Sequence, residues 1–278
     1  MATIEANGLL IGYDVEGAGP PLILLHGATS TAARDFRDQL PSLRRAFRVF
    51  MPDARGHGRT RWDVAANGLE AEWLVDDVLA FADALGLLSF HLVGFSLGAM
   101  TALGVAVRAP ARLRTLVVVG ISLEREPRAA VARRVMDPTR IERMDPAWAA
   151  DLAARHDPLQ GAGAWRRLLA AIAADVAVQP LLTSRQVRTI DAPTFVAVGD
   201  RDPFTPVADA WELSRTVIDG RLLVLPGAGH EAFAERASIA SAALETFYRS
   251  TEEVARRRAG EVAEGRAGEV AGNGPARP

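Results

Sequence analysis

The sequence of 278 residues contains no cysteine and no lysine. Without cysteine, the chain forms no disulfide, no thiolate metal site and no cysteine nucleophile. All 32 basic residues are arginine, so a Schiff-base lysine and the lysine of a phosphate-binding loop are absent as well. Composition alone therefore excludes several large classes of enzyme.

The chain also lacks an excess of positive charge and any long apolar run. Its formal net charge is −2, which leaves no cationic surplus for binding nucleic acid. The first ten residues do not read as a signal peptide, and no apolar run approaches the roughly 18 residues of a membrane span. We expect a cytoplasmic protein with no membrane partner; the sequence gives no indication of oligomeric state.

Short apolar runs alternate with longer helical patterns, as in a mostly parallel sheet flanked by helices. We therefore predict an α/β fold. The expected strands are Leu9 to Val15, Leu22 to Leu25, Arg48 to Met51, Phe90 to Val93, Leu113 to Val119, Thr194 to Val198 and Leu222 to Leu225.

Three regions differ in pattern along the chain. Residues 1–122 and 189–250 form the predicted core domain, and residues 123–188 read as an inserted helical cap. Prolines 138, 146 and 158, each preceded by Asp, are expected to break the cap into short helices. Residues 251–278 carry five Arg, five Glu and little apolar bulk, which predicts a frayed or disordered tail.

The strongest chemical signal is Gly94-Phe95-Ser96-Leu97-Gly98, between an expected strand and the helical pattern Ala99 to Arg108. A serine on such a tight strand-to-helix turn projects its hydroxyl clear of the sheet, and small flanking residues let the backbone turn. Ser96 is therefore the candidate nucleophile, and the helix behind it stabilises developing negative charge.

A serine nucleophile needs a base, and the base needs a carboxylate that orients it. Among five histidines, His230 is the best candidate because it lies in a glycine-containing loop just after the last expected strand. The turn after the strand Thr194 to Val198 offers two carboxylates, Asp200 and Asp202.

The order Ser96, acid, His230 along the chain is the order found in the α/β-hydrolase superfamily. The chain resembles this superfamily from about Leu9 to Tyr248. This resemblance implies an α/β-hydrolase fold with a cap, and it favours Asp202 as the acid because the family places it fourth in a Gly-x-x-Asp turn. Further implied sites are a His26-Gly27 pair and an oxyanion hole formed by the amides of Ala28 and Leu97, with Thr29 as the alternative to Ala28.

Other residues admit both a functional and a structural interpretation. In Asp53-Ala-Arg55-Gly-His57-Gly, which resembles a loop common in the family, Arg55 and His57 either form a second charge pair near the site or hold the loop in place, and we favour the latter. Phe95, Trp148 and Trp165 are candidate substrate-binding residues, although the tryptophans fit packing between cap and sheet equally well. His156 fits a helix-end residue on a solvated face better than a substrate contact.

The expected reaction is hydrolysis of a small carboxylic ester, lactone or thioester through an acyl-enzyme on Ser96. No metal-ligand spacing is present and the lone glycine-rich stretch precedes a strand, so we expect neither metal nor other cofactor. The cap segment 124–190 has 11 Arg against 8 acidic residues, a slight indication of a carboxylate-bearing substrate. Alternatives are carbon–carbon bond hydrolysis, perhydrolysis or a biosynthetic cyclisation on the same residues, and a non-catalytic protein that binds small molecules.

Overall fold

An eight-stranded sheet organises the computed structural model, which describes residues 2–62 and 69–272, with side chains described up to residue 254. The strands are β1 (Ala2–Ala6), β2 (Leu9–Glu16), β3 (Pro21–Leu25), β4 (Arg48–Pro52), β5 (Phe90–Phe95), β6 (Leu113–Val119), β7 (Thr194–Gly199) and β8 (Gly220–Leu225). Their order in the sheet is β1-β2-β4-β3-β5-β6-β7-β8. Pairing is antiparallel from β1 through β2 to β4 and parallel from there to β8.

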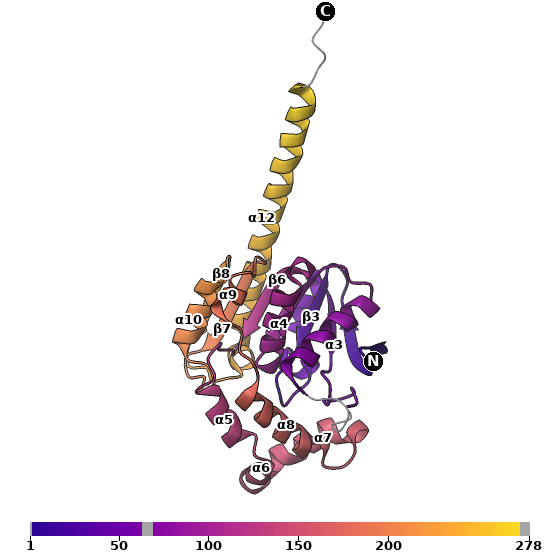
Figure 1. The fold of residues 1–278 in the computed structure, drawn as a ribbon, viewed down its shortest axis with the longest axis vertical. Helices are drawn as coiled ribbons and strands as arrows, with labels where there is room; N and C mark the ends of the chain where they lie inside the picture. The colour runs from indigo at the N-terminus through magenta and orange to yellow at the C-terminus, as the bar shows by residue number, and fades with distance from the viewer. Residues whose placement is uncertain (1, 63–68, 273–278) are drawn as a thin grey trace, which may run out of the picture. The chain divides into compact units, whose positions relative to one another are not determined.

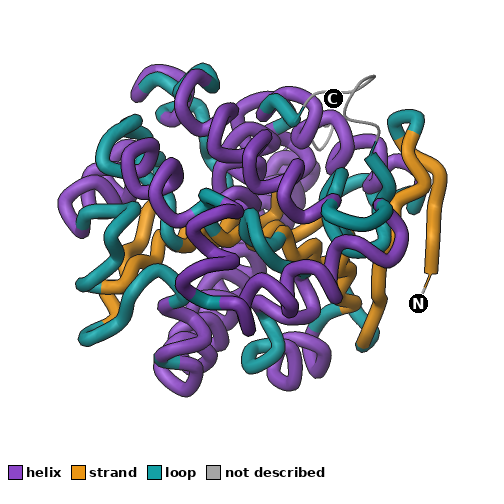
Figure 2. The backbone as a smooth tube through the Cα atoms, turned by 90° about the horizontal axis from the view of Figure 1, so that it is seen from below, coloured by secondary structure: helices purple, strands orange, loops and turns teal. Residues whose placement is uncertain are grey.

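Helices cover the sheet on both sides, and Figure 2 shows them flanking the band of strands. Outside the cap, the helices of residues 1–241 are α1 (Ala32–Asp35), α2 (Leu40–Ala46), α3 (Ala71–Ala84), α4 (Leu97–Arg108), the short 3-10 helix η1 (Pro110–Arg112), α10 (Val207–Thr216) and α11 (Ala232–Glu235). A last helix, α12 (Ala237–Gly272), begins in this part of the chain and continues beyond it. Central strands such as β6 and β7 are buried along most of their length, because both faces of the sheet are covered. The predicted α/β fold class is therefore confirmed.

All seven predicted strands are present, with bounds within two residues of those expected. The sequence analysis did not predict β1, which pairs with β2 at the edge of the sheet. Its residues alternate between half-buried and exposed positions and include Thr3 and Glu5, so the segment lacks the apolar run by which the others were found.

Five helices lie between β6 and β7, where the cap was expected, and Figure 1 shows four of them gathered at one end of the strands. They are α5 (Arg128–Val135), α6 (Pro138–Met144), α7 (Pro146–Gln160), α8 (Ala164–Val178) and α9 (Ser184–Val187). New helices begin at Pro138 and Pro146, where the prolines predicted breaks. Asp137 and Asp145 cap these helices, because their carboxylates accept hydrogen bonds from the first free amides.

The predicted break at Pro158 is wrong. This proline lies inside the last turn of α7, which continues to Gln160. A proline there removes only one hydrogen bond near the helix end, where its cost is small. Asp157 accepts instead from the amides of Gly163 and Trp165, at 2.8 and 3.1 Å, and so orders the start of α8.

The C-terminal segment also differs from its prediction, because α12 continues as a helix through Gly272. Alanine, glutamate and arginine all have high helix propensity, so a lack of apolar bulk does not prevent a helix. Residues 273–278 of the predicted tail lie outside the described residues. Contacts divide the chain into residues 1–241 and 242–278, and the features below belong to the first unit.

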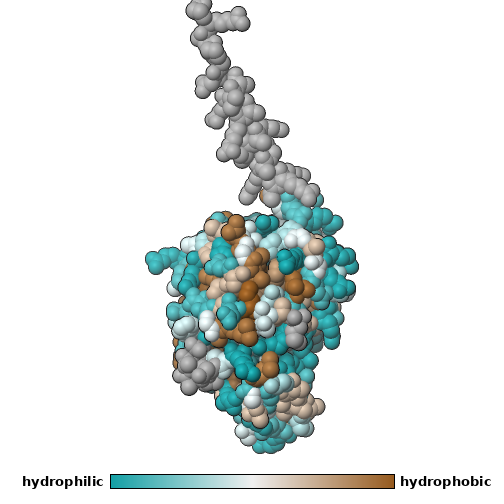
Figure 3. All heavy atoms as spheres, turned by 90° about the vertical axis from the view of Figure 1, so that its right-hand side faces the viewer, coloured by the Kyte–Doolittle hydropathy of each residue, from teal (hydrophilic) through white to brown (hydrophobic). Residues whose placement is uncertain are grey.

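Among the described residues of this unit, apolar side chains gather in clusters, of which two bear on the site. The larger lies between the sheet and its helices, with Ile23, Phe81, Leu92 and Val118 among its members. The second joins cap helices α5, α7 and α8 to the loops at the ends of β3 and β5. Figure 3 shows further apolar residues scattered among hydrophilic ones on one face, as on most folded proteins. Of the helices as far as they are described, none is both long and apolar enough to cross a bilayer.

Candidate active site

Ser96 lies on a strained turn between β5 and α4. Its φ of 52° and ψ of −110° place a non-glycine residue in a region that costs energy, typical of functional sites. Two glycines make the turn possible: a Cβ on Gly94 would lie 2.2 Å from the carbonyl oxygen of Gly98, and one on Gly98 would lie 2.2 Å from that of Leu25. The spacing of the motif thus follows from the closeness of β3, β5 and α4.

The structure brings Ser96, His230 and Asp202 into one hydrogen-bonded chain. His230 Nε2 lies 2.9 Å from Ser96 Oγ, and His230 Nδ1 lies 2.8 Å from Asp202 Oδ2. The Asp202 side chain is fully buried, whereas that of His230 is 18% exposed. With Nδ1 donating to the carboxylate, Nε2 is free to accept the serine proton.

The turn after β7 separates the two candidate acids. Asp202 uses its second oxygen to accept from the amides of Phe204 and Thr205, at 2.7 and 3.1 Å, which fixes the carboxylate. Asp200 Oδ1 accepts from the amide of Ala228 at 3.2 Å and joins the turn to the loop that carries the histidine. Asp202 is therefore the residue that orients His230, and Asp200 braces the loop.

The loop after β3 has its carbonyl groups held from two sides. His57 Nε2 lies 2.9 Å from the carbonyl oxygen of Ala28. The Thr29 carbonyl accepts from Arg155 Nη1 and lies 3.3 Å from His156 Nε2, both on cap helix α7. A cap helix and the His57 loop together set the orientation of these peptides.

The neighbouring peptide is fixed in the same way. Gly27 donates its amide to Asp35 Oδ2 at 2.8 Å, and its carbonyl oxygen lies 2.7 Å from His26 Nδ1. Among the described residues, no acceptor is found for the amides of Ala28 and Leu97, the two predicted oxyanion donors. Both amides belong to segments adjoining Ser96, as a donor pair for a developing oxyanion requires.

Three buried histidines pack edge to face beside this loop, and none of them is exposed to solvent as a helix-end residue on a solvated face would be. The ring centroids of His26 and His57 are 4.8 Å apart, and those of His57 and His156 are 5.4 Å apart. Burial is the main cause that lowers the pKa of His57 to about 4, and the nearby His26 contributes less. Burial likewise is the main cause that lowers the pKa of His156 to about 2, with a smaller contribution from His57. The rings are neutral at pH 7 and act as hydrogen-bonding braces.

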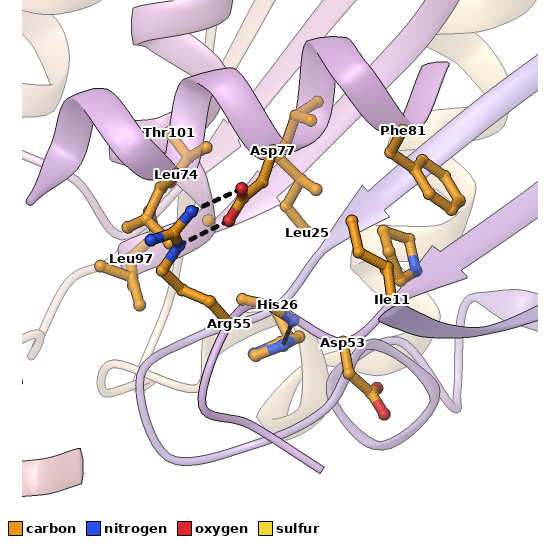
Figure 4. Close-up of a pocket in the computed structure, with 14 residues that line it drawn as sticks. Ile11, Leu25, His26, Asp53, Arg55, Leu74, Asp77, Phe81, Leu97 and Thr101 are labelled. Carbon is orange, nitrogen blue, oxygen red and sulfur yellow. Dashed lines mark hydrogen bonds and ion pairs between the residues drawn. The ribbon is translucent and has the colours of Figure 1, made fainter. Parts of the chain in front are cut away.

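Arg55 makes a buried ion pair with Asp77 on α3, shown by the dashed lines in Figure 4. Its Nε and Nη2 lie 2.7 and 2.6 Å from the two carboxylate oxygens, and the Arg55 side chain is 1% exposed. The pair lines a mostly apolar cavity of about 40 Å³ together with Leu97 and His26. The contacts of Arg55 and His57 match the structural interpretation of their loop.

The predicted substrate-binding aromatics differ in placement. The Phe95 ring lies 5.0 Å from the ring of His230, beside the candidate site. Trp165 is 2% exposed and belongs to the cap cluster, and Trp148 packs against that cluster while half-buried. The structure thus gives Trp165 a packing role, and it brings only Phe95 of the three against a member of the Ser–His–Asp chain.

Sequence analysis missed three residues beside the site. Gly120, directly after β6 with φ of +64°, is so close that a Cβ there would lie 3.1 Å from His230 Cε1. Phe204 packs against His230, and the centroids of the two rings are 4.3 Å apart. Asp35 holds the Gly27 amide, and burial raises the pKa of its carboxyl. Of these three residues, only Gly120 had a signal in the sequence, because it is a glycine directly after a predicted central strand.

The class of protein follows from a comparison with known families. The model of the Alpha/beta hydrolase family matches residues 22–243, well over half of the chain, so the chain belongs to that family. This confirms the resemblance found in the sequence. Across the residues with described side chains, no group of three or more His, Asp or Glu is arranged to hold a metal ion.

Individual relatives are more distant. A 2-hydroxymuconate semialdehyde hydrolase of a Pseudomonas species is 36% identical over 119 residues, 42% of each chain. A 2-(acetamidomethylene)succinate hydrolase of Mesorhizobium japonicum is 27% identical over 245 residues, 82% of this chain and 87% of that protein. The first three curated relatives are matched over only about half of their length, 46%, 42% and 54%.

Solved structures agree on the fold. The enol-lactonase of Burkholderia xenovorans superposes with a TM-score of 0.72 over 89% of this chain and 100% of that chain, at 21% identity. At this identity the likeness shows the fold alone.

Proposed function

We propose that the chain is a serine hydrolase that cleaves a small carboxylic ester, lactone or thioester through an acyl-enzyme on Ser96. The hydrogen-bonded chain from Asp202 through His230 to Ser96 Oγ carries this proposal. A serine on a strained turn, a base at 2.9 Å and a buried orienting carboxylate are the parts that acyl transfer requires.

The reaction proceeds in two half-reactions. His230 accepts the Ser96 proton as the oxygen attacks the carbonyl carbon, and the amides of Ala28 and Leu97 donate to the oxyanion. His230 then gives its proton to the leaving alkoxide or thiolate, which leaves Ser96 acylated. Water loses a proton to His230, attacks the acyl carbon and releases the acid, and the proton returns to the serine.

Most of the relatives' names support hydrolysis while differing in substrate, although one is a 1H-3-hydroxy-4-oxoquinoline 2,4-dioxygenase. They include a semialdehyde hydrolase, a carbamate hydrolase and a 2-(acetamidomethylene)succinate hydrolase. The semialdehyde hydrolase favours a second candidate, carbon–carbon bond hydrolysis of a dicarbonyl compound on the same Ser96 and His230. In that reaction the leaving group is a carbanion, which takes its proton from His230 or water.

A panel of short-chain aryl esters, small lactones, thioesters and one dicarbonyl compound tests the proposal. Wild type is compared with Ser96→Ala, His230→Ala and Asp202→Asn, with Asp200→Asn as the control that leaves the hydrogen-bonded chain intact. Each of the first three should reduce kcat/KM by at least about 10³-fold. Mass spectrometry of quenched reactions should show acyl adducts on wild type and none on Ser96→Ala.

Two results would count against this assignment. If Ser96→Ala retains wild-type turnover, the nucleophile is wrong. If wild type cleaves only the dicarbonyl compound, the second candidate replaces the first.

A further inference from the structure

Arg128 is an unusual buried cation at the start of cap helix α5. The residue is only 7% exposed, and its Nε and Nη2 atoms are buried without a hydrogen-bond partner among the described residues. Burying a guanidinium without partners costs free energy, so native proteins normally pair such groups. Nε and Nη2 share one edge of the guanidinium plane, the edge that matches the two oxygens of a carboxylate.

Gln179 is a second unpaired polar side chain in the same corner of the cap. It follows α8, is 2% exposed, and neither its Nε2 nor its Oε1 has a partner in the described part of the chain. Its backbone is engaged: the amide donates to the carbonyl of Asp175 at 2.7 Å, and the carbonyl accepts from Arg125 Nη2 at 3.0 Å. The unpaired groups are therefore confined to the side chain.

Arg125 shows what a paired arginine looks like here. Its guanidinium donates to the carbonyls of Ala177 and Gln179, at 2.7 and 3.0 Å, and so ties the segment before α5 to the end of α8. Burial is the main cause that lowers the pKa of Arg128 to about 10, and the nearby Arg125 lowers it further. Asp175 acts in the opposite direction, but among the described residues it forms no ion pair with Arg128 within 4.0 Å. The Arg128 charge is therefore only partly balanced.

Arg128 belongs to a helix that packs against residues beside the candidate active site. Ala129 and Ala132 of α5 belong to the apolar cluster that also contains Ala28 and Leu97, the proposed oxyanion donors. Arg128 precedes Ala129 directly and lies one helical turn before Ala132, so it lies on the buried face of α5 that packs against this cluster.

We propose that Arg128 and Gln179 form an anion subsite that binds a free carboxylate of the substrate. The hydrolase then acts on esters or lactones that carry a second, ionised carboxylate, with Arg128 bound through Nε and Nη2 and Gln179 donating through its amide nitrogen. This inference rests on the proposed function, because it assigns a substrate class to the same site.

The test compares charged and neutral forms of one substrate. Mono-4-nitrophenyl esters of succinic, glutaric and adipic acid cover a range of spacings, and their methyl 4-nitrophenyl diesters lack the charge. Wild type, Arg128→Met, Arg128→Lys and Gln179→Leu are assayed with both sets. Arg134→Met, an exposed arginine on the same helix, is the matched control.

For the best half-ester, Arg128→Met should lower kcat/KM roughly 10- to 100-fold, mainly through KM, as expected for loss of a charged bidentate hydrogen bond. For the diester, the kcat/KM of Arg128→Met should differ from that of wild type by less than about twofold. Arg128→Lys should recover part of the loss, because it keeps the charge without the planar edge. The melting temperature of Arg128→Met should stay the same or rise, since the variant removes an unpaired buried charge.

The proposal is overturned if Arg128→Met weakens both ester forms equally, or if wild type shows no preference for any half-ester over its diester. If wild type cleaves neither form, the proposed function fails separately. The subsite is then judged by calorimetric titration of glutarate into wild type and Arg128→Met. Binding that is lost in the variant supports it, and absent or unchanged binding refutes it.

Discussion

Lowering the pH from 7 to 5 should destabilise the folded state through His156. In the folded chain the pKa of His156 is lowered to about 2, mainly by burial and to a smaller extent by the nearby His57. An exposed histidine titrates near the ordinary value of 6.5. Below pH 6.5 the unfolded state therefore binds a proton that the folded state does not. The stability gained from a neutral His156 is complete above pH 6.5 and is lost as the pH falls toward 2, by about 2 kcal/mol at pH 5.

Urea unfolding of wild type and His156→Gln at pH 7 and pH 5 measures this effect. Glutamine keeps an acceptor for the Gly58 amide, 3.1 Å from His156 Nδ1, and a donor for the Thr29 carbonyl, but it does not titrate. Between the two pH values wild type should lose about 2 kcal/mol more unfolding free energy than the variant. Arg134→Met serves as a control and should retain the acid sensitivity of wild type.

Equal losses in wild type and His156→Gln would refute the argument. An NMR titration provides an independent check, because the His156 ring signals of the folded protein should not shift between pH 7 and pH 5. A midpoint near 6.5 would mean that the ring is not held neutral by its burial.

Three further outcomes are expected. Asp202→Asn should lower kcat about 10³- to 10⁴-fold by removing the carboxylate that fixes the histidine tautomer, whereas Asp200→Asn should change kcat less than tenfold, as steady-state kinetics would show. Gly120→Ala should cost about 1 kcal/mol of unfolding free energy at its positive φ and reduce kcat by crowding the histidine ring, and a variant with wild-type kcat would contradict the close approach. Arg55→Met should destabilise the fold by roughly 3–5 kcal/mol in urea, and adding Asp77→Leu should restore most of the loss; a double variant as unstable as the single one would argue against the buried-pair explanation.

The sequence predicted most of the sheet and the Ser–His–Asp chain because both have local signals. Strands buried on both faces read as apolar runs, and Ser96, Asp202 and His230 each follow such a run. The parallel order of these strands brings their carboxyl ends to one edge, so three short turns were enough to identify the residues.

What sequence analysis missed depends on contacts between distant segments. His156 acts on the loop at Gly27 to Thr29 across 127 residues, although Asp35 holds the same loop from only eight residues away. No spacing or composition marks such a contact. The unpaired side chains of Arg128 and Gln179 are likewise recognisable only once burial and hydrogen bonds are known.

The length of chain between the parts of the site has a consequence for folding. The Ser96–His230 hydrogen bond spans 134 residues, and the whole cap and the pairing of β6 with β7 fall within that span. Closing so long a segment costs chain entropy before any of its contacts repay it, and non-local pairings of this kind form slowly. The nucleophile therefore meets its base only in molecules whose sheet has already joined across the cap. Until the two parts of the chain meet, the serine has no base to activate it.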